Sequence, residues 1–136
     1  YRINLTADGR EPNGPSYWPA ISGNSRYVAF VSEATNLVPS DTNGVRDAFV
    51  VDTCFGATNA CTPSIERFSG TTGTDQLIVN SPLGAPQRAP AISGDGRWAL
   101  FDANPVNPLV QGEASGVAAV FRASSGFAFD LPPYVP

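Results

Sequence analysis

Short apolar runs separated by turn residues dominate the chain, and this pattern predicts a protein built from β-strands. The runs at residues 27–31 and 48–51 are rich in the β-branched and aromatic side chains that favour strands. Further strands are expected at residues 65–68, 98–101 and 120–121. No segment shows the 3.6-residue periodicity of an amphipathic helix of useful length. The pattern therefore predicts an all-β fold.

Two stretches of the chain repeat each other at an offset of 71 residues. The segment YWPAISGNSRYVAFVS begins at Tyr17, and RAPAISGDGRWALFDA begins at Arg88. After one extra residue, which we place at Pro108, SDTNGVRDAF (from Ser40) matches GEASGVAAVF (from Gly112). A match of this length and order is not expected by chance. The sequence therefore predicts two copies of one structural unit.

Each copy carries a turn between a short PAIS strand and the strand that follows. The turns fall at residues 23–25 and 94–96. Asp-Gly is favoured in a type I′ hairpin because both central positions take positive φ, so we expect this turn at Asp95-Gly96. Residues 1–6 alternate polar and apolar side chains, as a fourth strand without its own blade would.

The first copy reads PAISGNSRYVAFVSEATNLVPSDTNGVRDAFVVD and resembles the TolB-type, WD-repeat-like propeller blades of secreted bacterial proteins. The second copy follows the same pattern more loosely. The resemblance implies two four-stranded antiparallel β-propeller blades, a partial propeller, within a single domain over residues 1–136. Blade 1 would span about residues 16–69 and blade 2 about 87–130, with 1–6 as a blade-completing strand. The resemblance is specific for the fold and not for the function.

An incomplete propeller needs a partner, since propellers typically have about four to eight blades. We expect the chain to bind other protein subunits or copies of itself, or to be a fragment of a larger propeller protein or enzyme. A net charge of −4 argues against nucleic acid as the partner. No apolar run approaches the ~18 residues of a transmembrane segment.

Cys54 and Cys61 enclose a short loop, and two chemistries suit such a pair. A zinc site needs about four ligands and the chain has no His, so a disulfide that pins a hairpin is the preferred interpretation. A disulfide places the protein in an extracytoplasmic compartment, which means periplasmic, cell-surface or secreted. The absence of His also removes the commonest general base, and we expect no enzymatic activity.

The segment around Asp41, Asn43 and Asp47 is the candidate metal site. Oxygen-bearing side chains at close spacing, with Gly44 to permit a sharp loop, can bind Ca²⁺ as a cofactor. The alternative is structural: the first two side chains cap their own turn, and Asp47 pairs with an Arg or accepts backbone N–H bonds. The second copy lacks two of these three groups.

Tyr17 and Trp18 precede the first PAIS strand, where a loop could expose them to a ligand or partner. The leading hypothesis is a non-catalytic interaction or scaffold subunit that contributes blades to a larger assembly. The alternative is a carbohydrate-binding, lectin-like module in which aromatic side chains stack on sugar rings.

Overall fold

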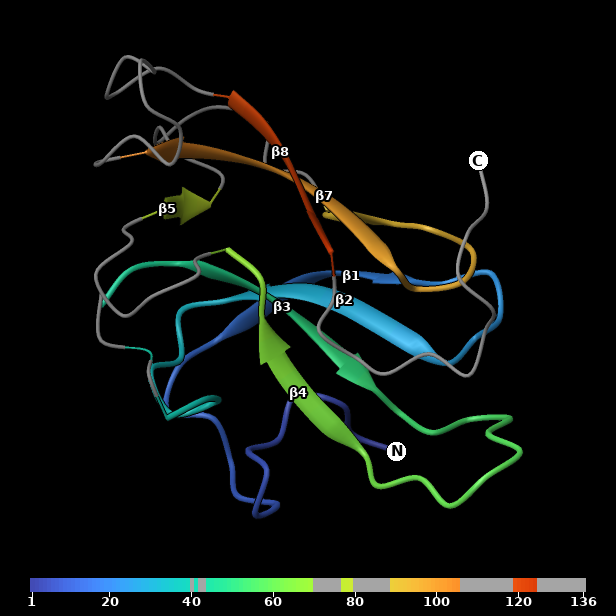
Figure 1. Cartoon of the computed structure of the whole chain (residues 1–136). Coiled ribbons are helices and arrows are strands. Elements are labelled where there is room, and N and C mark those ends of the chain that lie inside the picture. Colours follow the sequence, from blue (N-terminus) through green and yellow to red (C-terminus); the bar gives the residue numbers. More distant parts are fainter. Residues whose placement is uncertain (40, 42–43, 70–76, 80–88, 106–118, 125–136) are drawn as a thin grey trace.

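The computed structural model describes residues 1–39, 41, 44–69, 77–79, 89–105 and 119–124. This part of the chain contains eight strands and no helix, and the strands form two antiparallel sheets that lie one over the other (Figure 1). The all-β prediction is confirmed. The described residues include no helix that is long and apolar enough to cross a membrane.

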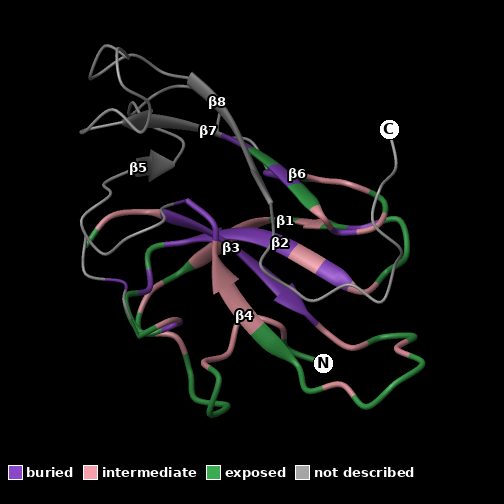
Figure 2. Cartoon of the chain, in the orientation of Figure 1, coloured by how far each residue is buried: buried purple, intermediate pink, exposed green. Residues whose placement is uncertain are grey.

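Sheet 1 is a meander of β1 (Ser16–Ile21), β2 (Tyr27–Ser32), β3 (Asp47–Asp52) and β4 (Ser64–Arg67). Its strands follow chain order, so each strand pairs with the next one along the chain. The two central strands are buried along almost their whole length (Figure 2), which requires cover on both faces of the sheet. The four-stranded sheet predicted for the first copy is thus confirmed.

Sheet 2 contains β5 (Leu77–Val79), β6 (Ala91–Ile92), β7 (Trp98–Pro105) and β8 (Ala119–Ser124). Strand β6 pairs with the first half of β7 and β5 pairs with its end. Strand β8 also pairs with β7. The sequence did not predict β5, since a three-residue run carries too little periodicity. The remainder of predicted blade 2, beyond residue 124, lies outside the described residues.

The pairing registers show that the two sheets are copies of one unit. The equivalent Cα partners are Ala20↔Ala29 and Ala91↔Leu100 in the first strand pair, and Phe30↔Phe49 and Phe101↔Phe121 in the second. The offset is 71 residues up to β7 and grows by one residue at β8. An extra residue therefore lies between these two strands, as the sequence alignment predicted.

The same hydrogen-bonded turn joins the first two strands of each copy. In the second copy, the Ser93 hydroxyl accepts the Trp98 backbone N–H at 3.0 Å and donates to Asp95 Oδ1 at 2.7 Å. Asp95 Oδ1 also accepts the Arg97 backbone N–H at 3.0 Å. The first copy forms the same three bonds through Ser22, Tyr27, Asn24 and Arg26. The sequence repeat therefore encodes a repeated turn.

This turn is not the type I′ hairpin predicted at Asp95-Gly96. Gly96 takes a positive φ of 78°, whereas Asp95 is not among the positive-φ residues. The Gly96 N–H donates to the Ser93 carbonyl at 2.9 Å, so the chain reverses before Gly96. A longer hairpin loop of this kind needs only one left-handed residue, after the turn. Ser25 takes that position in the first copy, with φ of 61°.

Apolar side chains cover both faces of sheet 1. We call the cluster between the sheets the inner core; it comprises Tyr27, Ala29, Val31, Ala48, Val50, Phe68, Ala99 and Phe101. The outer cluster lies on the opposite face and comprises Phe30, Ala34, Leu37, Phe49 and Val51, with Ile3, Val38 and Ile65 packed against it. Sheet 1 is therefore the centre of three layers, the third of which is only the N-terminal segment and nearby loops.

The two sheets stack through unlike faces. Phe101 of sheet 2 packs into the inner core, whereas its equivalent Phe30 packs on the outer face of sheet 1. Conversely, Tyr27 faces sheet 2, while its equivalent Trp98 is 42% exposed beyond sheet 2. Successive side chains of a strand point to opposite faces, so the sheets follow each other in the same sense. Such stacking is heterologous, because it joins two different faces.

The equivalent turns of the two copies also touch. The Asn24 N–H donates to the Gly94 carbonyl at 3.0 Å. The Tyr27 ring lies so close to Gly96 that a Cβ there would be 2.1 Å from Tyr27 Cδ2. Glycine is therefore required at this position by the packing between the copies and is favoured there by the positive φ.

Replacing Gly96 by Ala should lower the free energy of unfolding by about 2–4 kcal/mol, because a strained φ and an overpacked contact add together. Gly9 is the matched control: its φ is 79° and nothing lies within 4 Å of a Cβ there. Gly9→Ala should lose only about 1 kcal/mol. Urea denaturation measures both. Equal losses would contradict the described contact with Tyr27.

The turn also makes stability depend on pH. The hydrogen bond from the Ser93 hydroxyl, and then the Arg97 backbone N–H, lower the pKa of Asp95. The ionised carboxylate therefore stabilises the fold above the unfolded-state pKa of about 3.9, and this contribution is lost as pH falls through the folded-state pKa. Asn24 is the equivalent residue in the first copy, so Asp95→Asn should keep the turn. The melting temperature of this variant should fall less steeply with decreasing pH than that of the wild type. Identical slopes in both proteins would refute this assignment.

Candidate functional site

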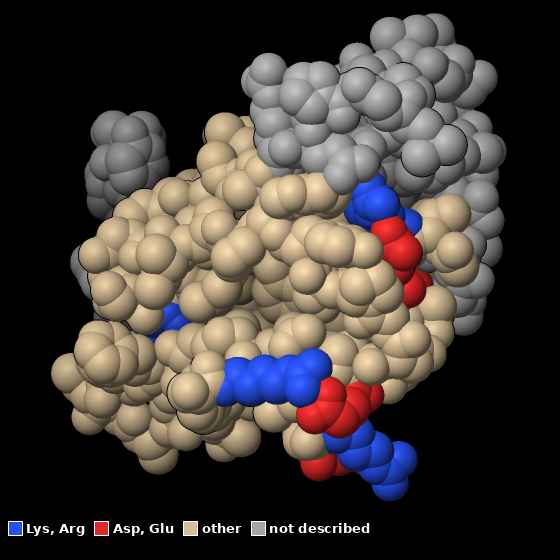
Figure 3. Space-filling model, turned by 180° about the vertical axis from the view of Figure 1, so that it is seen from behind, with Lys and Arg blue, Asp and Glu red and all other residues tan. Residues whose placement is uncertain are grey.

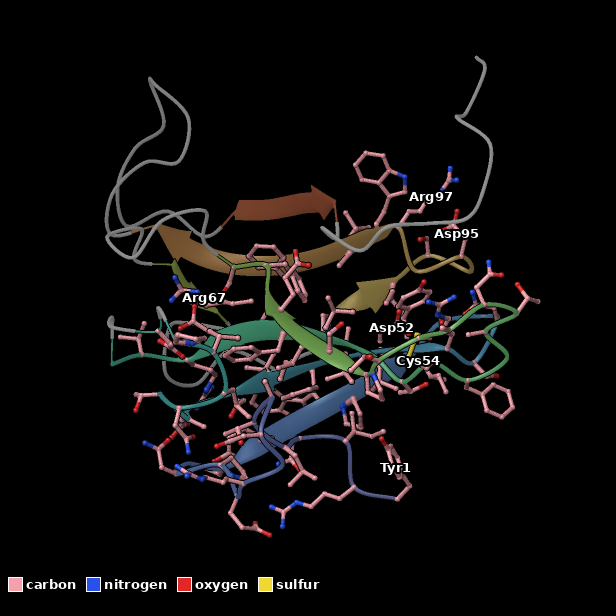
Figure 4. All side chains as sticks on the ribbon, turned by 60° about the horizontal axis from the view of Figure 1, so that its bottom comes forward. Tyr1, Asp52, Cys54, Arg67, Asp95 and Arg97 are labelled. Atoms are coloured by element: carbon pink, nitrogen blue, oxygen red, sulfur yellow. A yellow bond between two sulfur atoms is a disulfide. The ribbon has the colours of Figure 1, made fainter. Side chains whose placement is uncertain are left out.

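Asp41 and Asp47, two of the predicted calcium ligands, lie together with fully buried side chains. Arg67 at the end of β4 reaches both: its Nη1 is 3.5 Å from Asp41 Oδ1 and 3.7 Å from Asp47 Oδ2. The Ser69 hydroxyl donates to Asp47 Oδ1 and accepts the Ala48 N–H at 3.0 Å. Figure 4 shows Arg67 at the opposite end of sheet 1 from Asp52.

This cluster matches the structural alternative, in which Asp47 pairs with an arginine. The third candidate ligand, Asn43, lies outside the described residues. A guanidinium beside both carboxylates offsets negative charge that Ca²⁺ would otherwise offset. Sequence reasoning did not single out Arg67. Arg67 of β4 pairs with Phe49 of β3, and Asp47 lies two residues before Phe49, so Arg67 and Asp47 share one face of sheet 1. A bound Ca²⁺ stays a prediction.

Arg67→Met should lower the free energy of unfolding by about 3–5 kcal/mol, because it leaves two buried carboxylates without this cation. Arg10→Met is the control, since Arg10 and Asp8 form an exposed pair and its loss should cost below about 1 kcal/mol. Urea denaturation compares the two variants, and similar losses would contradict the account.

Thermal melting of the wild type with Ca²⁺ and with EDTA tests for a bound ion. Ca²⁺ raises the melting temperature if the native state binds it.

Tyr17 and Trp18 lie within β1 and are half-buried, so their predicted placement in a loop is wrong. A β-bulge between Tyr17 and Ala20, with Trp18 at φ of 51°, turns the indole towards the inner core. The two rings stack at 5.0 Å, and the Arg46 guanidinium lies 5.6 and 5.3 Å from their centroids. Both rings thus pack on each other and on a cation within the fold.

Cys54 and Cys61 form the predicted disulfide, which bridges the connection between β3 and β4. Asp52 fixes this connection: its Oδ1 accepts the Cys54 N–H at 2.8 Å, and both of its oxygens pair with Arg26, at 2.8 and 2.7 Å. Among the described residues, Asp52 and the two cysteines also form a group whose possible ligand atoms lie close enough together to hold a metal ion. The two sulfur atoms are joined in the disulfide, however, and a cysteine binds a metal ion as the free thiolate.

Large apolar side chains are exposed at both open faces of the sheet stack. Near the outer face of sheet 1, Tyr1, Ile21 and Phe55 are 97%, 61% and 66% exposed. On the outer face of sheet 2, Trp98 and Leu100 are 42% and 44% exposed. The sequence analysis did not single out Ile21, Phe55 or Leu100, although strand alternation within each copy was the signal that could have found the two strand residues, Ile21 and Leu100.

A pocket of ≈ 430 Å³ opens on the outer face of sheet 1. Its apolar lining comes from Tyr1, Ile3, Ile21, Val28 and Phe55, and Ser25 contributes from the turn. Figure 4 shows the labelled Tyr1 at the periphery, on the side of sheet 1 away from sheet 2. An apolar pocket rimmed by exposed aromatic side chains suits the burial of another apolar side chain.

Charged groups of the described residues are largely neutralised within the chain. Every arginine whose side chain is described lies in an ion pair with Asp or Glu. Seen from behind, arginine and acidic side chains gather in small groups, and most of the surface is uncharged (Figure 3). Among the described residues, the surface seen there has no extended patch of one charge.

Neither a protein-family model, nor a curated protein, nor a solved structure matches this chain. The resemblance to propeller blades therefore rests on the residues of the two copies, and any proposal for function rests on the geometry of the faces described above.

Proposed function

We propose that this chain is a non-catalytic, extracytoplasmic scaffold subunit that contributes two propeller blades to a larger protein assembly. One observation carries the proposal: the contact inside the chain buries one sheet face against another, while large apolar side chains of the described residues are exposed near the two outer faces. Tyr27 is 1% exposed in the inner core, and its equivalent Trp98 is 42% exposed. Large apolar side chains that remain partly exposed at a sheet face are of the kind that protein interfaces cover.

The energetic argument supports the same conclusion. Complete burial of a large apolar side chain contributes roughly 1.5–3 kcal/mol, and aromatic side chains are the commonest anchors of protein interfaces. Five such side chains stand exposed at the two open faces. A contact that buries these side chains would therefore stabilise the assembly.

The Cys54–Cys61 disulfide supports the extracytoplasmic assignment, because such bonds persist in oxidising compartments. The absence of histidine throughout the chain supports a non-catalytic role. A lectin-like role has less support, since the Tyr17 and Trp18 rings already stack on each other and contact Arg46.

The proposal predicts that the chain occurs in a particle well above its own 14.2 kDa in the cells that produce it. Gel filtration of the extracytoplasmic fraction, with a tagged chain, measures this. A double variant, Phe55→Ser and Trp98→Ser, should elute close to the monomer, because it removes one exposed aromatic side chain from each open face. Thr35→Ser on the β2–β3 loop is the control. Wild-type chain that elutes as a monomer would overturn the proposal.

A further inference from the structure

We infer that the Cys54–Cys61 disulfide is a site of thiol–disulfide exchange, at which an external thiolate attacks Cys54 and Cys61 leaves. The thiol that the site takes is a small molecule with an apolar body, because Cys54 lines the apolar pocket on the outer face of sheet 1. This activity goes beyond the proposed scaffold function and does not depend on it.

The two cysteines differ in their access to the pocket. Both residues are half-buried, so neither is sealed from solvent. Cys54 lines the ≈ 430 Å³ pocket beside apolar side chains, whereas Cys61 is not among the lining residues. Figure 4 shows the labelled Cys54 and its disulfide close to Asp52, at one end of sheet 1. A pocket of this size and lining suits a small apolar molecule, and a thiol held in it lies next to Cys54.

Arg26 makes Cys61 the better leaving group. Its Nη2 donates a hydrogen bond to Cys61 Sγ at 3.6 Å. Among the described residues, no arginine donates in this way to Cys54 Sγ. A thiolate that accepts a hydrogen bond from a cation is stabilised, and a more stable thiolate leaves faster. Attack on Cys54, which releases Cys61 beside the guanidinium, is therefore favoured over attack on Cys61.

Asp52 holds this guanidinium in place. Its Oδ2 lies 4.0 Å from Cys61 Sγ, where an isolated carboxylate would oppose a thiolate. Both of its oxygens accept hydrogen bonds from Arg26, however, at 2.8 and 2.7 Å, and Oδ1 also accepts the Cys54 N–H at 2.8 Å. The charge of the carboxylate is thus offset, and the two-point contact fixes the guanidinium next to the sulfur that leaves.

The backbone at Cys54 also favours opening of the bridge. Cys54 has a φ of 61°, a left-handed conformation that residues other than glycine seldom adopt. The bridge to Cys61 helps to hold this conformation, together with the turn in which the Ala57 N–H donates to the Cys54 carbonyl at 3.1 Å. Disulfides that are strained or exposed are the ones that exchange readily.

Sheet 1 stays intact when the bridge opens, because other contacts hold the strands on either side. The two cysteines are only 7 residues apart, so their bond restricts the unfolded chain less than a bond across a longer loop would. Asp52 pairs with Ser64 where β3 meets β4, and the Thr53 N–H donates to the Arg26 carbonyl at 3.0 Å. The connection between the strands can therefore open without loss of their pairing.

The exchange needs no reagent besides the thiol. The lone pair of the incoming thiolate forms an S–S bond to Cys54 Sγ, and the electron pair of the old bond leaves on Cys61 Sγ. The incoming thiol is thereby oxidised to a mixed disulfide, and Cys61 is reduced to a thiolate. The proton of the incoming thiol goes to water before the attack.

The thiol class is tested by the rates at which 2-phenylethanethiol and 2-mercaptoethanol open the bridge. Each rate on the native, purified chain is divided by the rate of the same thiol on the chain unfolded in urea, which removes the intrinsic reactivity of the thiol. The ratio should be at least about threefold higher for 2-phenylethanethiol, because the pocket binds its apolar ring. Ile21→Ser should reduce this preference and Thr35→Ser should not. Equal ratios in the wild type would overturn the assignment of an apolar thiol.

Arg26→Gln should slow exchange about 3–10-fold, Arg26→Lys should slow it less, and Arg10→Gln, in an exposed pair, should not change it. A second readout is the pH profile of Cys61 alkylation by iodoacetamide in the Cys54→Ser background. Cys61 should react at lower pH with Arg26 present than with Arg26→Gln. An unchanged profile would overturn the role of the guanidinium. Circular dichroism checks folding, and Arg26→Gln with Asp52→Asn replaces Arg26→Gln if that variant unfolds.

Mass spectrometry identifies the sulfur that is attacked and tests the inference most directly. The purified full chain is exposed briefly to 2-phenylethanethiol, and the released thiol is trapped with N-ethylmaleimide. We expect the phenylethanethiol adduct on Cys54 and the maleimide on Cys61, in at least ~10-fold excess over the reverse product. Equal amounts of the two products, an excess of the reverse product, or a bridge that opens no faster than in the unfolded chain would overturn the inference.

Discussion

The contact between Tyr27 and the turn at Gly96 determines how the two copies stack, and the remaining features of the structure follow from it. Tyr27 belongs to the first copy and Gly96 to the second, at the position that Ser25 holds in the first. Once the aromatic side chain of one copy lies on the turn of the next, the strands below must present unlike faces to each other. The inner core, the touching turns and the two open faces are consequences of that arrangement.

Burial in sheet 1 shows how each of its faces is covered within the chain. Its central strands carry apolar side chains on both faces, and sheet 2 covers only one of them. The N-terminal segment and nearby loops cover part of the other face and leave apolar pockets beside Val28. In the proposed assembly, substitutions at the exposed apolar side chains should therefore affect association more than folding.

The sequence predicted the features that depend on local or repeated patterns. These are the all-β class, the offset between the copies, the extra residue before β8 and the disulfide. It did not predict features that depend on which distant groups meet. Arg67 reaches Asp41 and Asp47 only through strand pairing, and the bulge at Trp18 places an aromatic side chain that composition could only assign to a loop. The predicted turn type at Asp95-Gly96 was wrong because Asp-Gly suits several loop lengths.

The fluorescence of Trp98 tests most directly whether the proposed assembly covers the outer face of sheet 2. The chain has two tryptophans, so Trp18→Phe leaves Trp98 as the sole indole and keeps an aromatic ring in β1. As protein concentration rises and light scattering shows assembly, the account predicts that Trp98 emission shifts to shorter wavelength and that acrylamide quenches it less. Assembly in which Trp98 keeps the emission and quenching of a water-exposed indole would contradict the account.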